Sequence, residues 1–192
     1  MTDWQRRLTE DLEPILRAPD PRPAISAYHD MPYAIFLYPP EEEYPLRQQV
    51  ALLRTRLEQS GKRVTTISLA ECMRAALEAE GLAPAALAEA EIRVGLPAAI
   101  DTITEVLSTY QPLDRLVAAR LPADADPLRD VVFIVRTGAL FPVYRTCALL
   151  DQLTGQLCVP AVLFYPGTVD GANGLSFMGV LDPDPNYRPR IF

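Results

Sequence analysis

Three short runs of apolar residues most restrict the fold that this chain can adopt. They occupy positions 33–38, 131–135 and 161–165, and none of them contains a charged residue. Uninterrupted apolar runs of this length are typical of strands that are buried on both faces of a parallel sheet. Residues 64–69 predict a fourth strand, and residues 176–181 and 190–192 predict two further β segments near the end of the chain.

Helical spacing of apolar residues separates these strands. Residues 3–17 predict an amphipathic helix, which leads into a proline-rich connector. A helix after Pro45 joins the first two strands into a β-α-β unit, for which a right-handed parallel crossover is the default. Glutamates 41–43 suit the dipole at the start of that helix. We expect the helix after the strand at 131–135 to open at Pro142, and the strand at 161–165 to end in a turn at Pro166 and Gly167.

The whole chain of 192 residues is long enough to bury a core as one domain. We therefore predict a single α/β domain over residues 1–192, with a mainly parallel sheet and flanking helices. Its N-terminal helix and connector occupy residues 1–24. Residues 70–121 predict a helical insertion of three or four short helices, with breaks at Gly81, Pro84, Gly95, Pro97 and Pro112.

The predicted core is P-loop-like or Rossmann-like but lacks a phosphate-binding motif. A phosphate loop needs several glycines and a lysine next to a helix N-terminus. The turn at 136–142 contains one glycine, and Pro142 has no N–H to donate. Lys62, the one lysine of the chain, precedes the strand at 64–69. We expect no nucleotide hydrolysis of the usual kind and no cofactor.

The charge balance restricts the partners. The chain has 25 acidic and 18 basic residues and a net charge of −7, which argues against binding nucleic acid on its own. One histidine and three cysteines without a CxxC motif do not make a zinc site, and we expect Cys72, Cys147 and Cys158 to be reduced core thiols of a cytoplasmic protein. The longest uncharged stretch, 152–169, is interrupted by glycine and proline, so we expect no membrane segment.

Few residues suggest chemistry. His29 lies between Tyr28 and Asp30, with no nucleophile that can be identified beside it, and we interpret it as a surface or capping residue. Asp182 and Asp184 alternate with prolines, as in solvated loops, and we expect no metal there.

The carboxyl ends of parallel strands are where ligands usually bind. Arginines near these ends could bind phosphate, carboxylate or an acidic partner; alternatively, they pair with acidic residues of the chain and cap the strands. The candidate partner-binding or phosphate-binding edge comprises Arg136, Thr137, Tyr144, Arg145, Tyr165, Gly167, Arg188 and Arg190.

Four segments in order resemble one family. VRTGALFPVYR (135–145), VPAVLFYPG (159–167), GLSFMG (174–179) and the terminal YRPRIF (187–192) are similar to the BrxB family of small proteins in bacteriophage exclusion (BREX) defence systems. The resemblance implies a cytoplasmic bacterial or archaeal protein that acts with an alkaline-phosphatase-like protein, a DNA methyltransferase and a large ATPase. It carries no catalytic residues over to this chain.

Two hypotheses follow from these observations. The first is a non-catalytic accessory component that docks other BREX proteins through the arginine-bearing edge. The second is a degenerate nucleotide or nucleic-acid phosphate sensor that uses the same arginines. A hydrolase with an unfamiliar site is a third interpretation, for which the sequence offers no residues.

Overall fold

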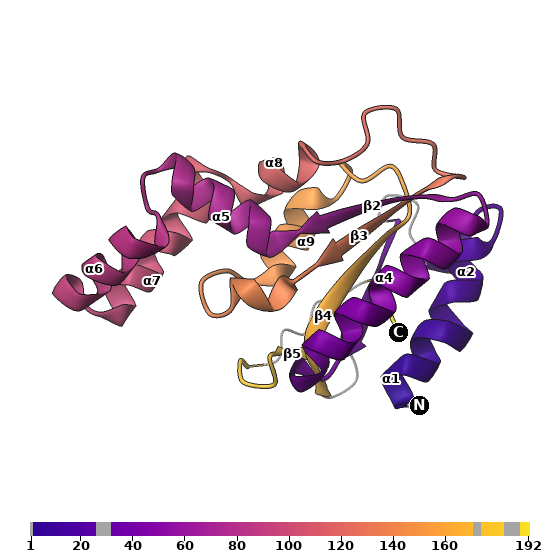
Figure 1. The fold of residues 1–192 in the computed structure, drawn as a ribbon, viewed down its shortest axis with the longest axis horizontal. Helices are drawn as coiled ribbons and strands as arrows, with labels where there is room; N and C mark the ends of the chain where they lie inside the picture. The colour runs from indigo at the N-terminus through magenta and orange to yellow at the C-terminus, as the bar shows by residue number, and fades with distance from the viewer. Residues whose placement is uncertain (1, 26–31, 171–173, 183–188) are drawn as a thin grey trace.

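The computed structural model describes residues 2–25, 32–170, 174–182 and 189–192. Its centre is a sheet in which five parallel strands follow the order β2-β3-β4-β1-β6, and β5 pairs antiparallel with β4 (Figure 1). The expected α/β class with a mainly parallel sheet is confirmed. The strands are β1 (Tyr33–Tyr38), β2 (Arg63–Ser68), β3 (Asp130–Val135), β4 (Ala161–Asp170), β5 (Gly174–Phe177) and β6 (Arg190–Ile191).

Helices cover both faces of this sheet. The N-terminal helix is continuous from residue 3 to residue 17, as expected, and contains a π-helical segment. Its parts are α1 (Asp3–Arg6), η1 (Arg7–Leu12) and α2 (Glu13–Arg17), and the other helical elements are α3 (Arg22–Ile25), η2 (Pro40–Glu42), α4 (Glu43–Gln59), α5 (Leu69–Ala79), α6 (Pro84–Val94), α7 (Leu96–Glu105), η3 (Val106–Tyr110), α8 (Leu113–Ala118), η4 (Thr137–Leu140) and α9 (Thr146–Leu153).

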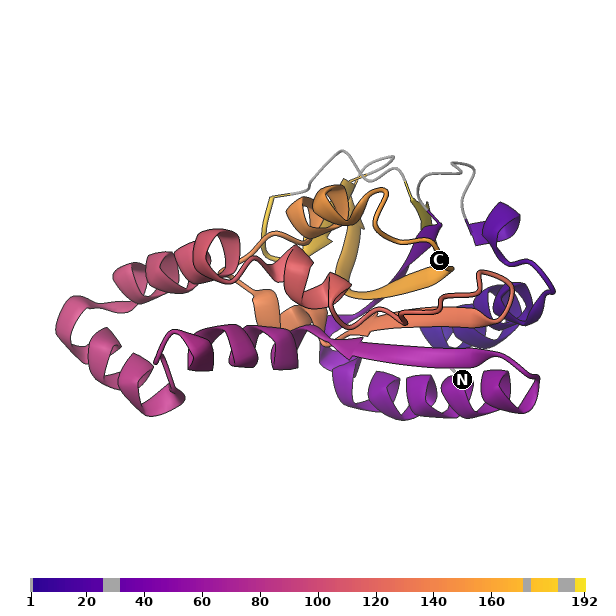
Figure 2. The ribbon, with the colours of Figure 1, turned by 90° about the horizontal axis from the view of Figure 1, so that it is seen from above.

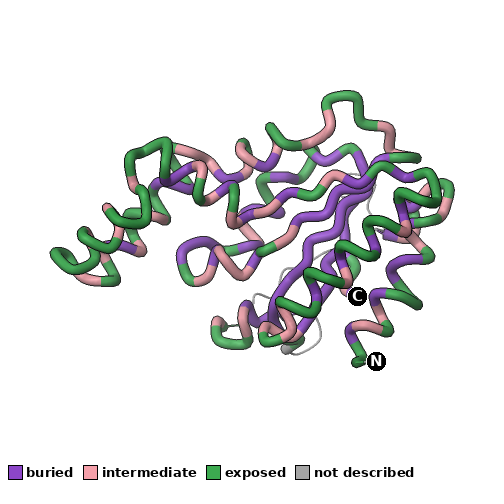
Figure 3. Tube along the Cα trace, in the orientation of Figure 1, coloured by how far each residue is buried: buried purple, intermediate pink, exposed green. Residues whose placement is uncertain are grey.

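Alternate side chains of the strands enter two separate cores. Along β4, Val162 and Phe164 face the N-terminal helix and α4, whereas Leu163 and Tyr165 face the side of α5, α8 and α9. Figure 2 shows the resulting three layers, with the sheet between the two helical layers. All these side chains are fully buried, as the purple centre of Figure 3 shows. The apolar runs in the sequence therefore predicted strands that are buried on both faces.

The chain between β2 and β3 forms the expected short helices. Gly81 and Gly95 have φ values of 73° and 85° at the ends of α5 and α6, and Pro84 opens α6. The helices α6 and α7 lie side by side and project beyond the sheet (Figures 1 and 2). We refer to α5–α7, residues 69–105, as the arm.

Three expectations about the last third of the chain are wrong. The β segment expected at 176–181 is β5 at Gly174–Phe177, and a turn follows it. The strand that begins at Ala161 continues through Pro166 and Gly167 to Asp170, because the Pro166 carbonyl accepts a hydrogen bond from Met178 N and Gly167 pairs with Phe177 of β5. The helix after β3 starts at Thr146, four residues beyond Pro142. The buried face of this helix consists of Thr146, Leu149, Leu150 and Leu153. Val143 is also buried, but it precedes the helix.

Lys62 has a structural role at the amino end of the sheet. Its Nζ donates hydrogen bonds to the backbone carbonyls of Ala18, at 2.5 Å, and Leu128, at 2.7 Å. Burial lowers the pKa of the Lys62 ammonium. Glu13 of α2 is also buried, and its two carboxylate oxygens share a bifurcated hydrogen bond from Arg56 Nε of α4, while Oε2 also accepts from Arg56 Nη2. Both residues fasten the N-terminal helix to the rest of the protein.

The cysteines differ from the expectation of three core thiols. All three are free, but only Cys72 is buried; Cys147 is half-buried and Cys158 is exposed. The apolar neighbours of Cys158 suggested a buried thiol. The residue is exposed because the chain leaves α9 there and enters the sheet only at Ala161. None of the helices in the described ranges has the length and apolar character needed to traverse a bilayer.

Candidate functional site

Arg136 lies at the carboxyl end of β3, at the edge where ligands of parallel sheets bind. It adopts the left-handed conformation, with φ 59° and ψ 37°, and its carbonyl accepts a hydrogen bond from Ala139 N. A left-handed backbone is costly for a residue with a Cβ. The exposed Arg136 guanidinium has no hydrogen bond or ion pair with any of the residues that the structure describes.

Arg136 faces α4 across two cavities of about 230 and 260 Å³. Both cavities are also lined by Glu43 and Arg47, so we treat them as one site, the arginine groove. The first cavity is completed by Leu46, Val50, Ala51, Arg54, Thr66, Val135 and Phe164, and the second by Pro40, Gly138, Ala139, Pro166 and Met178.

The α4 wall of the arginine groove is held by a chain of hydrogen bonds. The buried Tyr38 hydroxyl donates to Glu43 Oε2, and Arg47 Nε donates to Glu43 Oε1 at 2.8 Å. Burial, and then the bond to Glu43, raise the pKa of Tyr38 well above its usual range. The Arg47 guanidinium also lies over the Tyr44 ring, 4.9 Å from its centroid. Arg47 is therefore positioned in advance, in contrast to the unpaired Arg136.

The groove combines an apolar floor with a basic rim. Val135 of β3 and Phe164 of β4 lie at its base, and Arg54 pairs with Glu58 at 2.8 Å further along α4. An isolated guanidinium beside an apolar surface favours a ligand that carries both a carboxylate or phosphate and an apolar group. Sequence reasoning missed Arg47 and Met178 and treated Glu43 only as a dipole partner. The signal was the 3–4 residue spacing of Glu43, Leu46, Arg47, Val50, Ala51 and Arg54, which places them in one stripe of α4.

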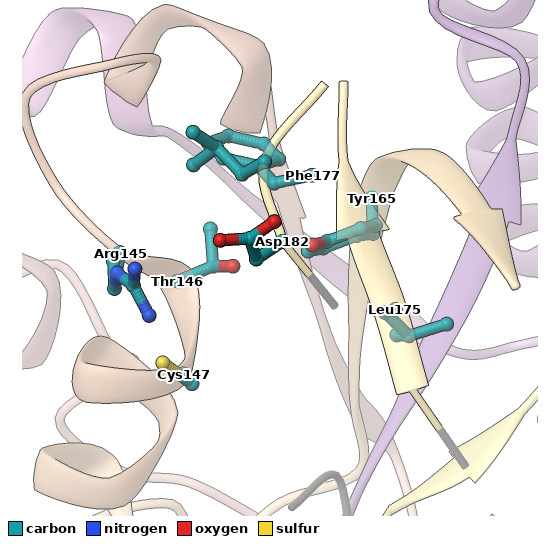
Figure 4. A pocket seen from close by; sticks show the side chains of 8 residues that line it. Arg145, Thr146, Cys147, Tyr165, Leu175, Phe177 and Asp182 are labelled. Carbon is teal, nitrogen blue, oxygen red and sulfur yellow. The ribbon is translucent and has the colours of Figure 1, made fainter. Parts of the chain in front are cut away.

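Arg145 lies on the other face of the sheet. It precedes α9 and lines a separate cavity of only about 20 Å³, enough for about one water molecule. Figure 4 shows Arg145 and Cys147 on the α9 side, Tyr165 and Leu175 on the strand side, and Asp182 between them. The structure therefore does not bring Arg136 and Arg145 into one pocket.

Arg190 lies at the opposite end of the sheet from Arg136. Parallel pairing aligns Arg190 with Ala34, near the start of β1. Its Nη1 donates a 2.7 Å hydrogen bond to the Ala24 carbonyl, and its guanidinium lies over the Phe192 ring, 4.5 Å from the centroid. Arg190 therefore makes contacts within the chain, to Ala24 and Phe192, and does not belong to the edge that contains Arg136. Arg188, His29 and Asp184 lie outside the described residues.

The remaining candidates are internal. Tyr144 is buried, donates to Gln152 Oε1 at 2.9 Å, and has its pKa raised by burial and then by the charge of Asp114. The Thr137 hydroxyl is fully buried and has no hydrogen-bond partner in the described part of the chain. Tyr165 packs in the core, 5.3 Å from the Phe177 ring between centroids. Of the seven candidates that the structure describes, Arg136 alone lines the arginine groove.

Gly167 allows two strands to approach. A Cβ at this position would lie 2.2 Å from the Ser176 carbonyl oxygen and 2.7 Å from Tyr165 Cε1. The glycine therefore has a packing role between β4 and β5. Among the described residues, no three His, Cys, Asp or Glu side chains gather closely enough to hold a metal ion.

Comparison with known proteins identifies the family. A family model described as BREX protein BrxB matches residues 65–191. A protein of Bacillus cereus (strain H3081.97) named "BREX protein BrxB" is 28% identical over 162 residues, which cover 83% of this chain and 82% of that protein. No solved structure matches the chain. The family model spans more than half of the residues of this chain, and the chain therefore belongs to the BrxB family of BREX proteins.

Proposed function

We propose that the protein is a non-catalytic accessory component of a bacterial BREX defence system and acts by binding another protein of that system. Membership of the BrxB family points to a component of such a system. The binding role rests on Arg136, whose guanidinium has no partner in the described ranges and which lines the arginine groove together with apolar residues. We propose this groove as the docking site.

The chemistry of the groove specifies the docked segment. Arg136 and Arg47 carry guanidinium groups that match a carboxylate, and the half-buried Val135 offers an apolar surface beside them. We infer that the partner inserts a segment with an Asp or Glu side chain next to an apolar side chain. The other BREX proteins named by the resemblance, an alkaline-phosphatase-like protein, a DNA methyltransferase and a large ATPase, are the partners to test.

Co-purification of the protein with each of the three partners tests this proposal. Arg136→Glu should reduce the recovered complex with at least one partner by tenfold or more. Arg129→Glu is a matched control, because Arg129 is also exposed but precedes β3, whereas Arg136 follows it. Equal recovery of wild type and Arg136→Glu with all three partners, or no complex with any, would contradict the proposal.

A phosphate sensor is the second candidate, and the shared cavity of Arg47 and Arg136 is the observation in its favour. Against it, the first turn of α4 and the preceding η2 carry Glu41, Glu42 and Glu43, which occupy the position where a helix N-terminus would attract phosphate. Thermal-shift titrations with ATP, GTP, cyclic nucleotides and short DNA separate the candidates. A saturable rise in melting temperature that Arg136→Glu abolishes would favour the sensor, since a ligand of the native state raises stability.

A further inference from the structure

The arm contains the largest of the grooves described for this protein. It has a volume of about 430 Å³ and lies between α5, α6 and α7, within the range of ligand-binding cavities. Ten of its thirteen lining residues are apolar, including Met73, Leu87, Leu96 and Ile100. The other three, Arg74, Glu78 and Glu91, lie among them. No side chain of α6 is buried, although Pro84, Leu87, Ala88 and Glu91 of this helix line the groove.

Large apolar side chains are also exposed where α6 meets α7. Ile92 is 85% exposed, Val94 61% and Leu96 56%. The helices α6 and α7 form the projecting end of the molecule in Figure 1, and this end is mostly green, that is exposed, in Figure 3. Large exposed apolar side chains that lie close together in the chain are a feature of interaction sites on soluble proteins. Leu96 lines the groove as well as being exposed, whereas Ile92 and Val94 lie outside the groove.

The charge of the arm selects among possible occupants. Residues 69–105 contain seven acidic and two basic residues, a net charge of −5 out of −7 for the whole chain. Nucleic acid and anionic membranes are repelled by such a surface. A second copy of the arm would bring the same negative charge into contact, which is costly in a closed interface. A positively charged protein segment is the occupant that the surface favours.

We propose that the groove of the arm binds a basic amphipathic helix of another protein. A helix places apolar side chains at intervals of three and four residues, which is how amphipathic helices occupy apolar grooves. Glu78 already pairs with Arg74 at 3.9 Å, so lysines or arginines beside that apolar stripe would face Glu91, whose carboxylate has no ion pair with a described residue. This site is independent of the arginine groove, whose charge is opposite. The protein thus has two surfaces of different specificity and can contact two partners at once.

The probe is a fluorescein-labelled 15-residue peptide, LKKLLKLLKKLLKLL, which forms a helix with a leucine face and a lysine face. Fluorescence anisotropy should show saturable binding to the full-length protein in 0.15 M NaCl. The same peptide with Glu in place of Lys should bind at least tenfold more weakly. Glu91→Arg and Leu96→Ser should each weaken binding of the lysine peptide at least fivefold, and Glu91→Arg should strengthen binding of the glutamate peptide.

Two matched controls separate the groove from general charge attraction. Glu89→Arg makes the same charge change on α6 at an exposed residue outside the groove, and Val94→Ser removes an exposed apolar side chain outside it. Both should retain wild-type binding. Equal loss for Glu89→Arg and Glu91→Arg would overturn the proposal, as would no loss for Leu96→Ser. Sedimentation of the protein alone is the last measurement. A concentration-dependent dimer that Leu96→Ser dissociates would assign the groove to a second copy instead.

Discussion

Arg136 and Met178 share both a strained backbone and a cavity. Their φ values are 59° and 57°, and they are the non-glycine residues with positive φ in the described ranges. Both line the 260 Å³ cavity of the arginine groove, although they come from different turns of the chain. Strain of this kind concentrates at functional sites. The arginine groove is therefore marked by its backbone as well as by its unpaired guanidinium.

Strain at Arg136 predicts an unusual response to mutation. Glycine adopts the left-handed conformation freely, whereas alanine keeps the steric cost of a Cβ. After allowance for the greater freedom of glycine in the unfolded chain, Arg136→Gly should be more stable than Arg136→Ala by about 0.5–1 kcal/mol. Urea denaturation followed by circular dichroism measures the difference. A glycine variant less stable than the alanine variant would show that the backbone of Arg136 is not strained.

Gly167 is a position where adding a Cβ should destabilise the fold, because β4 and β5 approach each other closely there. A Cβ there would overlap the Ser176 carbonyl oxygen, so Gly167→Ala should destabilise the fold by about 1–3 kcal/mol. Gly138→Ala is the control, since its Cβ would meet Pro166 and Met178 at ordinary distances of 3.4 and 3.5 Å. Its effect should stay below about 1 kcal/mol. Equal effects of the two changes on the urea midpoint would refute this account of Gly167.

The sequence predicted the strands more reliably than their ends. The apolar runs that begin at Tyr33, Val131 and Ala161 could be recognised because burial on both faces leaves no position for a charge. The extension of β4 through Pro166 could not, because its support comes from β5, a partner later in the chain. Proline and glycine are normally turn residues, and here they occupy the segment that β5 approaches closely.

The site was predicted less well, for a related reason. Arg136 could be placed at the sheet edge because it follows an apolar run. Arg145 is nine residues further on, and the turn between them carries it to the other face of the sheet. Arg190 was misplaced because the register of β6 against β1 is set by tertiary pairing, which aligns it with Ala34. Arg47 could be assigned to the site only if the stripe of α4 that faces β3 was known.

Tyr38 predicts a loss of stability at alkaline pH. The pKa of its phenol is raised in the folded protein, first by burial and then by Glu43, above the unfolded value of 10.0. Its contribution is therefore complete below about pH 10 and is lost as the pH rises, because the unfolded chain releases the proton first. The loss is at most about 1.4 kcal/mol per pH unit.

Tyr38→Phe removes this titration. Urea unfolding at pH 8, 10 and 11 should show that the variant is less stable than wild type at pH 8, since it lacks the hydrogen bond to Glu43. The gap between the two proteins should narrow from pH 10 to pH 11. Parallel stability curves across this range would show that the phenol does not titrate as described.

Thiol reactivity should follow burial. Cys158 is exposed and should react first with Ellman's reagent under native conditions. Cys72 is buried, and burial raises the pKa of its thiol, so it should react only when the protein unfolds. Cys158→Ser should abolish the fast phase, and Cys72→Ser should leave it unchanged. A fast phase that survives in Cys158→Ser would contradict the exposure of this residue.

The affinity of Arg136→Gly for the partner identified by co-purification tests the docking role of the arginine groove most directly. Glycine adopts the left-handed conformation of Arg136 without steric cost, so we expect the variant to stay folded while it loses the whole side chain, including the guanidinium. Calorimetric titration should give a dissociation constant at least tenfold higher than that of wild type, with Arg129→Gly close to wild type. An unchanged dissociation constant for folded Arg136→Gly would contradict the proposal that the arginine groove holds a partner.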